Sequence, residues 1–262
     1  MTGGGAATNS GIDFQHRVGA LALVAMLTDL ADLDLVGLGE AGETPTQVRF
    51  ETADEVDDLV VVVGEARLLV QAKNTISLSA GEDSEFAKVV RQFVQQFCRG
   101  ARNERYVLAV SSGASGKIRV DFKKLCESYR LNESGVQDNP LTDNEREVLA
   151  AVNAHIDREF NSATGSDCDP LVRAAILRRI HVQSFDVVEG GANERLALVA
   201  LAPIAATDPR LLWRNLIAIC LGLSRGRLSI DASGLRERVK ALLVPPTARH
   251  LSRSGSGRGW WR

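Results

Sequence analysis

The segment from Val48 to Lys73 places two short apolar runs, both rich in β-branched residues, on either side of a four-residue turn. The runs are Leu59 to Val63 and Leu68 to Val70, and Gly64 to Arg67 lies between them. β-Branched residues favour extended structure and glycine favours turns, so this segment predicts a β-hairpin. The hairpin is therefore the predicted centre of the fold.

Polar residues stand at one end of each predicted strand. Asp57 and Asp58 enter the first strand, and Gln71 and Lys73 leave the second. In an antiparallel pair the start of one strand lies beside the end of the other, so these groups are expected at one edge of the sheet. Side chains alternate along a strand, so Gln71 and Lys73 share a face, and only one of the two aspartates can share it. Asp58 directly adjoins the apolar run and is the preferred candidate.

A carboxylate, a glutamine carbonyl and a lysine together are suited to phosphodiester cleavage. Mg²⁺ typically takes one or two carboxylates, and water and substrate phosphate complete its octahedron. A bound metal lowers the pKa of its water, and a lysine stabilises hydroxide or the charge on phosphate. Asp58 and Gln71 are thus the predicted metal ligands, and Lys73 is the predicted charge stabiliser. The alternative is that these residues are only the solvated ends of buried strands.

Asp58, thirteen residues before Gln71-Ala72-Lys73, resembles the D…(D/E/Q)xK signature of the PD-(D/E)XK nucleases, in the QxK form of Mrr-like restriction endonucleases. The chain resembles in particular the N-terminal nuclease effector domains of prokaryotic antiviral proteins that carry a STAND NTPase or are activated by cyclic nucleotides. The resemblance implies an α/β fold, a restriction-endonuclease-like core with a mixed central sheet flanked by helices. It also implies a DNA substrate and Mg²⁺, for which Mn²⁺ can substitute. The segments that carry the resemblance are 11–23, 57–62, 71–79 and 84–97.

The chain departs from the commonest pattern of that family at two points. Gln71 replaces an acid, and no proline precedes Asp58. Three accessory candidates stand nearby. Asp57 adjoins Asp58, and Glu51 lies seven residues upstream, although an exposed strand glutamate is the alternative there. Gln15 lies on a helix predicted from 10 to 30. In the nucleases that the chain resembles, an acid or a glutamine on this helix often faces the active centre. The alternative is that Gln15 belongs only to a solvated first turn.

A second amphipathic helix is predicted after the hairpin. Ser84 is a capping residue, and apolar residues recur at helical spacing up to Phe97. The opposite face is polar and can donate hydrogen bonds to phosphates, although such faces are usually only solvated. The DNA-contact candidates on this face are Lys88, Arg91, Gln92 and Gln95.

Four regions are predicted along the chain. They are a flexible arm at 1–9, the nuclease-like domain at 10–120, a mainly helical adaptor subdomain at 121–245 and a basic flexible tail at 246–262. The adaptor contains strand-like pieces at 182–188 and 196–200. Helix starts within it are predicted at Thr142 with Glu145, at Asp169-Pro170 and at Asp208-Pro209. In the tail, arginines with Trp260-Trp261 suit either stacking on nucleic acid or a partner protein, and the sequence does not separate these uses.

Composition limits the partners and the location of the chain. Its formal net charge is −2, so DNA binding has to rest on local basic surface and on metal. Four scattered cysteines are typical of reduced thiols in a cytoplasmic protein. Charges interrupt every apolar stretch before about 18 residues, so no membrane span is predicted. The loop Ser111 to Lys117 ends in Gly-Lys but lacks the first glycine and the hydroxyl of a P-loop, so no nucleotide site is expected there.

The sequence therefore predicts a Mg²⁺-dependent DNA endonuclease, and the resemblance alone suggests a role in prokaryotic antiphage defence. A homodimer is expected, because two cuts in duplex DNA usually need two active centres, and the resemblance adds a sensor or NTPase partner. The alternative is a catalytically degenerate nuclease fold that binds DNA or serves as a protein-interaction adaptor. Gln71 in place of an acid favours this alternative, and the intact Asp58 and Lys73 argue against it.

Overall fold

The hairpin predicted from the sequence forms two neighbouring strands in the middle of a larger sheet. Strand β2, Leu59–Val63, runs antiparallel to β3, Ala66–Lys73, and Leu59 pairs with Val70. Gly64 in the turn between them has a φ of 55°, a left-handed conformation that glycine adopts without strain. In this computed structural model, the described residues are 4–28, 43–56, 58–100, 103–131 and 140–245.

The sheet is open, mixed and six-stranded, in the order β5-β4-β3-β2-β1-β6. Strand β1, Pro45–Phe50, pairs antiparallel with β2 and with the short edge strand β6, Ser229–Asp231. Strand β4, Glu104–Val110, is parallel to β3, and β5, Ile180–Ser184, is parallel to β4. The α/β class and the mixed central sheet are thus confirmed. The restriction-endonuclease-like core stays a prediction.

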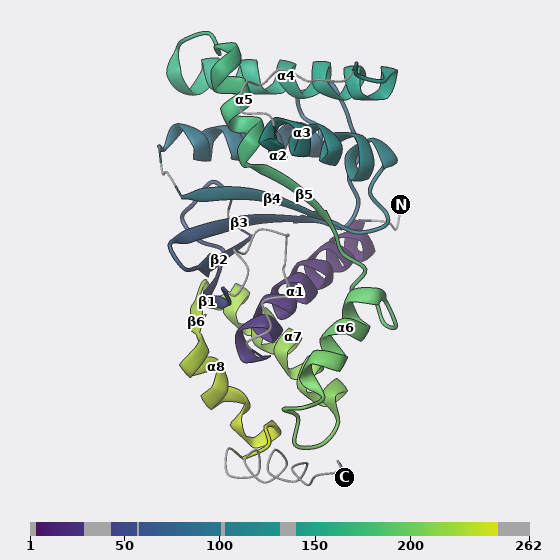
Figure 1. The fold of residues 1–262 in the computed structure, drawn as a ribbon, viewed down its shortest axis with the longest axis vertical. Coiled ribbons are helices and arrows are strands. Elements are labelled where there is room, and N and C mark those ends of the chain that lie inside the picture. The colour runs from purple at the N-terminus through teal and green to yellow at the C-terminus, as the bar shows by residue number, and fades with distance from the viewer. Residues whose placement is uncertain (1–3, 29–42, 57, 101–102, 132–139, 246–262) are drawn as a thin grey trace, which may run out of the picture.

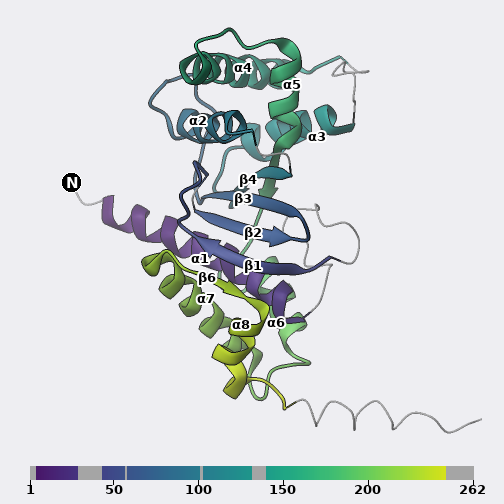
Figure 2. The ribbon, with the colours of Figure 1, turned by 90° about the vertical axis from the view of Figure 1, so that its left-hand side faces the viewer.

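Helices cover both faces of this sheet (Figure 1). Leu59 and Val61 of β2 point to one face and Val60 to the other, so each face has its own apolar core. On the first face lie α1 Gly4–Thr28, α6 Ala192–Leu201, α7 Pro209–Gly226 and α8 Ala232–Val239, which a short 3₁₀ turn, Lys240–Leu242, follows. On the second lie α2 Glu85–Cys98, the π-helix Lys117–Phe122, α3 Lys123–Leu131, α4 Asp143–Thr164 and α5 Pro170–Arg179. Figure 2 shows α2 between the sheet and α4.

Helix starts in the second half follow the sequence signals. Thr142 and Glu145 form the predicted capping box, and Asp169 and Asp208 cap α5 and α7 in front of a proline. The predicted strand at 196–200 is wrong, because these residues belong to α6. A run of about five apolar residues does not distinguish a strand from a buried helical turn.

The predicted regions differ from the observed arrangement in two places. The arm predicted at 1–9 is helical from Gly4 onward, since α1 begins there. The division at residue 120 does not follow the sheet, because β5 and β6 come from the second half and pair with β4 and β1. The tail at 246–262, with Trp260-Trp261, lies outside the described residues. No helix in the described part of the chain is long and apolar enough to cross a membrane.

His181 of β5 gives the fold a pH dependence that can be measured. Burial, reinforced by the nearby charges of Arg130 and Arg105, lowers the pKa of His181 from 6.5 to about 3. Below pH 6.5 the imidazole of His181 therefore binds a proton in the unfolded chain but not in the folded chain. The stability of the fold falls as the pH drops towards 3. The expected loss is up to about 1.4 kcal/mol per pH unit. Urea denaturation of wild type and His181→Phe at several pH values tests this, and equal pH slopes would contradict it.

Candidate active site

Asp58 lies at the entrance to β2, beside the end of β3, and the structure brings it together with Gln71. Its Oδ2 accepts hydrogen bonds from Gln71 Nε2 at 2.6 Å and from the backbone N–H of Ala72 at 2.9 Å. The antiparallel register explains this contact, because Leu59, the residue after Asp58, pairs with Val70, the residue before Gln71. Two donors from one strand therefore fix the carboxylate over the end of β3.

The side chain of Gln71 contributes an oxygen that no group in the described part of the chain satisfies. Gln71 is only 4% exposed, and its buried Oε1 has no hydrogen-bond partner among the residues that the structure describes. A buried carbonyl oxygen without a partner is costly, so such an atom calls for an explanation. The amide nitrogen of Gln71 already donates to Asp58. The amide oxygen is therefore the atom that is available to a bound cation. A carboxylate beside an unsatisfied amide oxygen fits the hard oxygen ligands that Mg²⁺ prefers.

This donor set is small. Within the described ranges, no three or more His, Cys, Asp or Glu side chains are grouped so that they could hold a metal ion. From the described residues, the centre offers one carboxylate, from Asp58, and one amide oxygen, from Gln71. Mg²⁺ is commonly bound in this way, with water and substrate phosphates completing the coordination.

Lys73 projects from the same face of β3 as Gln71, two residues further along. Its Nζ lies 3.1 Å from Glu85 Oε2, at the first residue of α2, and its side chain is 25% exposed. Glu85 also pairs with Lys88 at 2.8 Å. Hydrogen bonds from Lys88 and then from Lys73 lower the pKa of Glu85, so this carboxylate stays ionised and holds the lysine at the end of the strand.

The segment after Lys73 is held by two others that the sequence did not indicate as partners. Asn74 Nδ2 donates to Ser10 Oγ on α1, and Ser111 Oγ donates to the backbone oxygen of Asn74 at 2.6 Å. A Cβ at Gly113 would lie 3.3 Å from that same oxygen, so glycine permits the close approach of the loop after β4. The sequence signals for these contacts are the position of Asn74 next to Lys73 and the serines of the loop that begins at Ser111.

The structure places the accessory candidates Gln15 and Glu51 in different surroundings. Gln15 of α1 donates from Nε2 to the backbone oxygen of Asp58 at 3.0 Å, so it supports the loop that carries the aspartate. Glu51 is engaged by the end of α7: it accepts a hydrogen bond from Ser224 Oγ at 2.7 Å and lies 3.7 Å from Arg227 Nε. The structure therefore gives the Glu51 carboxylate a role in anchoring α7. Asp57 lies outside the described residues.

The four DNA-contact candidates lie on α2, which α4 covers in part (Figure 2). Arg91 pairs with the buried Glu159 of α4 at 3.1 Å, so it contributes to the packing of the two helices. Lys88 is exposed and pairs with Glu85, whereas Gln92 and Gln95 are half-buried. DNA contact by this face stays a prediction.

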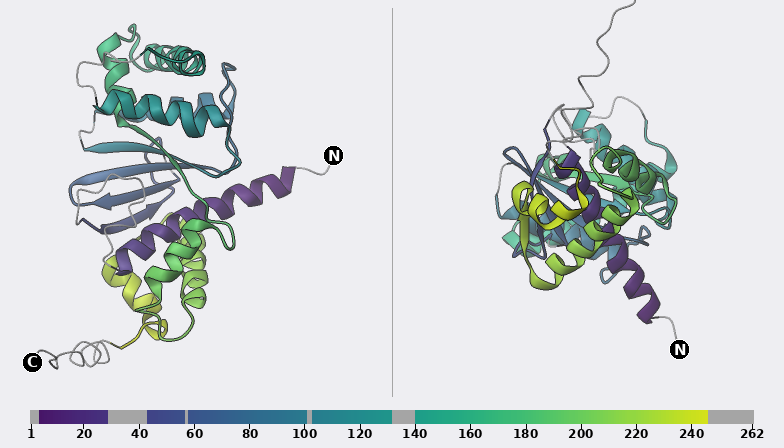
Figure 3. Two further views of the ribbon diagram at one scale, coloured as in Figure 1. Left: turned by 45° about the vertical axis from the view of Figure 1, so that its right-hand side comes forward. Right: turned by 90° about the horizontal axis from the view of Figure 1, so that it is seen from below.

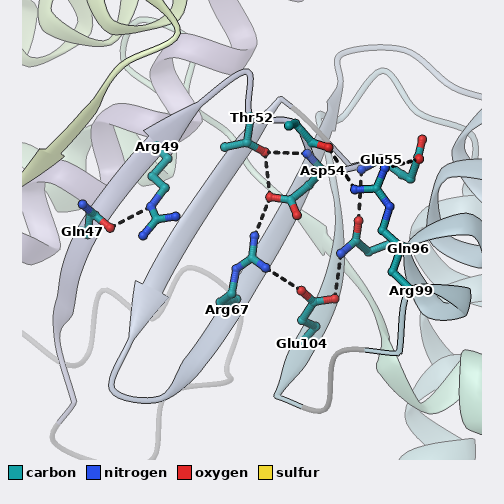
Figure 4. A network of polar contacts seen from close by, with 10 residues as sticks. Gln47, Arg49, Thr52, Asp54, Glu55, Arg67, Gln96, Arg99 and Glu104 are labelled. Carbon is teal, nitrogen blue, oxygen red and sulfur yellow. Dashed lines mark hydrogen bonds and ion pairs between the residues drawn. The ribbon is translucent and has the colours of Figure 1, made fainter.

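A second polar cluster fixes the loop that leads to Asp58 (Figure 4). Arg67, at the start of β3, donates from Nη1 to Glu104 Oε1 at 2.8 Å and from Nη2 to Asp54 of the loop. Gln96 of α2 donates to the other oxygen of Glu104 at 2.9 Å and accepts from the backbone N–H of Glu55 at 3.0 Å. Asp54 and Glu55 are thus bound to the sheet and to α2, a few residues before the candidate site.

Two solved structures align with most of this chain at low sequence identity. No family model and no curated protein match the chain. A solved structure of the Acinetobacter baumannii Cap4 SAVED/CARF-domain containing receptor with the cyclic trinucleotide 2'3'3'-cAAA aligns with 88% of this chain and 46% of its own, at 14% identity and a TM-score of 0.49. A second structure of that receptor, with 3'3'3'-cAAA, aligns with 87% of this chain and 44% of its own, at 15% identity and a TM-score of 0.48. The chain thus spans less than half of either structure.

Proposed function

We propose that this chain is a Mg²⁺-dependent DNA endonuclease whose active centre consists of Asp58, Gln71 and Lys73. The observation that supports the proposal most strongly is the contact of the Asp58 carboxylate with Gln71, whose buried Oε1 has no partner within the described ranges. Lys73 lies on the same strand face and supplies the positive charge that phosphodiester hydrolysis requires.

Each residue has a distinct role in the proposed reaction. Asp58 and Gln71 would hold the metal, which supplies charge neutralisation at the phosphate and a more acidic bound water. The Ala72 N–H and Gln71 Nε2 orient the Asp58 carboxylate. Lys73 donates hydrogen bonds to a phosphate oxygen or to the attacking hydroxide and so stabilises the negative charge that develops during cleavage. Glu85 keeps Lys73 at the end of β3.

The role of this activity in prokaryotic antiphage defence belongs to the same proposal. It is supported by the sequence resemblance of segments 11–23, 57–62, 71–79 and 84–97 to nuclease effector domains of antiviral proteins. A homodimer that cuts both strands, and a sensor or NTPase partner that controls cutting, are the assemblies expected with it.

A second candidate function is a catalytically degenerate nuclease fold that binds DNA or a protein partner. The observation in its favour is that Gln71 replaces an acid, so Asp58 is the one described carboxylate that is hydrogen-bonded to Gln71 and Ala72. Such a protein would retain the fold without cutting DNA.

Cleavage of supercoiled plasmid separates the two functions. We expect purified protein to cut in Mg²⁺ or Mn²⁺ and to be inactive in EDTA. Isothermal calorimetry with Mg²⁺ should detect binding by wild type and none by Asp58→Asn, because the carboxylate is the charged ligand. Asp143→Asn, at an exposed aspartate on α4, is the matched control and should bind as wild type does. An inactive wild type without Asp58-dependent Mg²⁺ binding would favour the adaptor.

A further inference from the structure

A cavity lined by arginines lies on the face of the sheet opposite α2. It has a volume of about 410 Å³ and is bounded by α1, α6, α7 and the connection from β5 to α6. That volume is within the usual range for ligand sites, roughly 300–1,000 Å³. Four arginines line it, against two glutamates, and they come from three helices: Arg17, Arg195, Arg210 and Arg214.

Two of these arginines are held in place by the protein. Arg17 Nε lies 2.7 Å from Asp13 Oδ2, and its Nη1 donates to the backbone oxygen of Val187 at 3.2 Å. Arg195 Nη1 donates to the backbone oxygen of Gly190 at 2.9 Å. Both guanidinium groups are therefore oriented before any ligand arrives, and a pre-oriented guanidinium binds at a lower entropic cost.

The side chains of the other two arginines, Arg210 and Arg214, are available to bind a ligand. Arg210 and Arg214 are exposed and stand four residues apart on α7, so they share one face of the helix. Among the residues that the structure describes, neither side chain takes part in a hydrogen bond or an ion pair. Like charges at this spacing destabilise a helix, so an anion between them would relieve a repulsion.

The four arginines outnumber the two glutamates of the cavity wall, and one of these, Glu194, is already hydrogen-bonded to the protein. Glu194 Oε1 accepts a hydrogen bond from Nε1 of the buried Trp213 at 3.1 Å, and its Oε2 accepts one from the backbone N–H of Gly190. Both carboxylate oxygens of Glu194 are thus used in hydrogen bonds that hold the cavity wall together. The chemistry left for a ligand is that of several guanidinium forks, which bind phosphate oxygens in pairs.

The cavity lies on the other side of α1 from the candidate active site. Gln15 contacts the backbone of Asp58, whereas Arg17, two residues later, lines the cavity. Two residues correspond to about 200° of rotation, so the two side chains leave opposite sides of the helix. Figure 3 shows α1 between the sheet on one side and α6 with α7 on the other. Helix α1 therefore lies between the cavity and the loop that carries Asp58.

We propose that the cavity between α1, α6 and α7 is a phosphate subsite that binds the backbone of the DNA substrate beside the candidate active site. The inference rests on the proposed function, since it assigns a second contact to the substrate of that site. It places DNA across α1, over the arginines of α6 and α7.

Binding of a short fluorescein-labelled duplex in EDTA, where no cleavage occurs, tests the subsite by fluorescence anisotropy. Arg210→Ala/Arg214→Ala is expected to weaken binding about tenfold or more, because two charge-assisted contacts are lost. The slope of log affinity against log salt should also fall by about 1 for each lost phosphate contact. The control, Lys123→Ala/Arg146→Ala, removes the same charge from α3 and α4 and should bind as wild type does. Equal affinity of the cavity variant and wild type would overturn the inference.

Trp213 provides a direct report from the cavity. The chain has three tryptophans, so Trp260→Phe/Trp261→Phe leaves Trp213 as the only tryptophan, whose emission can be excited selectively. Duplex DNA is expected to change this emission, and the change should vanish in the Arg210→Ala/Arg214→Ala background. A response to a 5′-mononucleotide but not to duplex would overturn the DNA subsite and indicate a pocket for free nucleotides.

The two proposals fail separately. Loss of duplex binding in the cavity variant, with no plasmid cleavage by wild type, would retain the subsite and remove the nuclease. Plasmid cleavage and duplex binding that are both unchanged in the cavity variant would remove the subsite and retain the nuclease.

Discussion

Replacing Lys73 by alanine is expected to slow DNA cleavage at saturating DNA by about 10²–10³-fold, the usual cost of removing one preorganised donor from a transition state. The loss should come from chemistry and not from folding. The ion pair of Lys73 with Glu85 is partly exposed, with side-chain exposures of 25% and 54%, and such pairs contribute at most about 1 kcal/mol to stability. The measurement is the single-turnover rate of plasmid nicking in Mg²⁺.

Two variants calibrate that measurement. Lys73→Arg keeps the charge on a different geometry, so we expect an intermediate rate. Lys123→Ala removes a lysine that lies 3.8 Å from Glu127 on the surface of α3, and it should cut at the wild-type rate. If Lys73→Ala cuts within about twofold of Lys123→Ala, the stabilising role of Lys73 is wrong, since a lost donor costs at least about 10²-fold.

The central hairpin and the contact between Asp58 and Gln71 follow from local sequence. Two strands joined by a tight turn can pair in few registers, and alternation then fixes which side chains meet. For the same reason α2 was predictable from its apolar stripe and from Ser84, which caps it. These features depend on residues within about one or two secondary-structure elements of one another.

The remainder depends on pairings that local patterns do not encode. Strand β6 has three residues and joins β1 from the far end of the chain. The hydrogen bond between Glu51 and Ser224 spans 173 residues, so the pattern around Glu51 could not show that α7 engages its carboxylate. The arginine-lined cavity likewise unites Arg17 with Arg214, and only the packing of α1 against α7 brings them together. Long-range contacts of this kind determine the positions of Glu51 and of the cavity arginines.

Replacing Arg67 by methionine is expected to lower the free energy of unfolding by about 3 kcal/mol. Glu104 is 3% exposed, and Arg67 is its cationic partner, so the substitution leaves a carboxylate buried without a counter-charge. The value is at the low end of the range for broken buried pairs, because Arg67 is 32% exposed and Gln96 still donates to Glu104. Urea denaturation gives the difference from wild type.

The same cluster supplies the control for this experiment. Arg99 pairs with Glu55, but the side chains are 45% and 35% exposed, so Arg99→Ala should cost less than about 1 kcal/mol. Adding Glu104→Gln to Arg67→Met removes the stranded charge and should recover part of the loss. If Arg67→Met lowers the free energy of unfolding no more than Arg99→Ala does, the prediction is wrong. The burial of Glu104 would then not make its ion pair with Arg67 more stabilising than an exposed pair. Because Arg67 also binds Asp54 in the loop before Asp58, a confirmed loss should be accompanied by weaker Mg²⁺ binding in calorimetry.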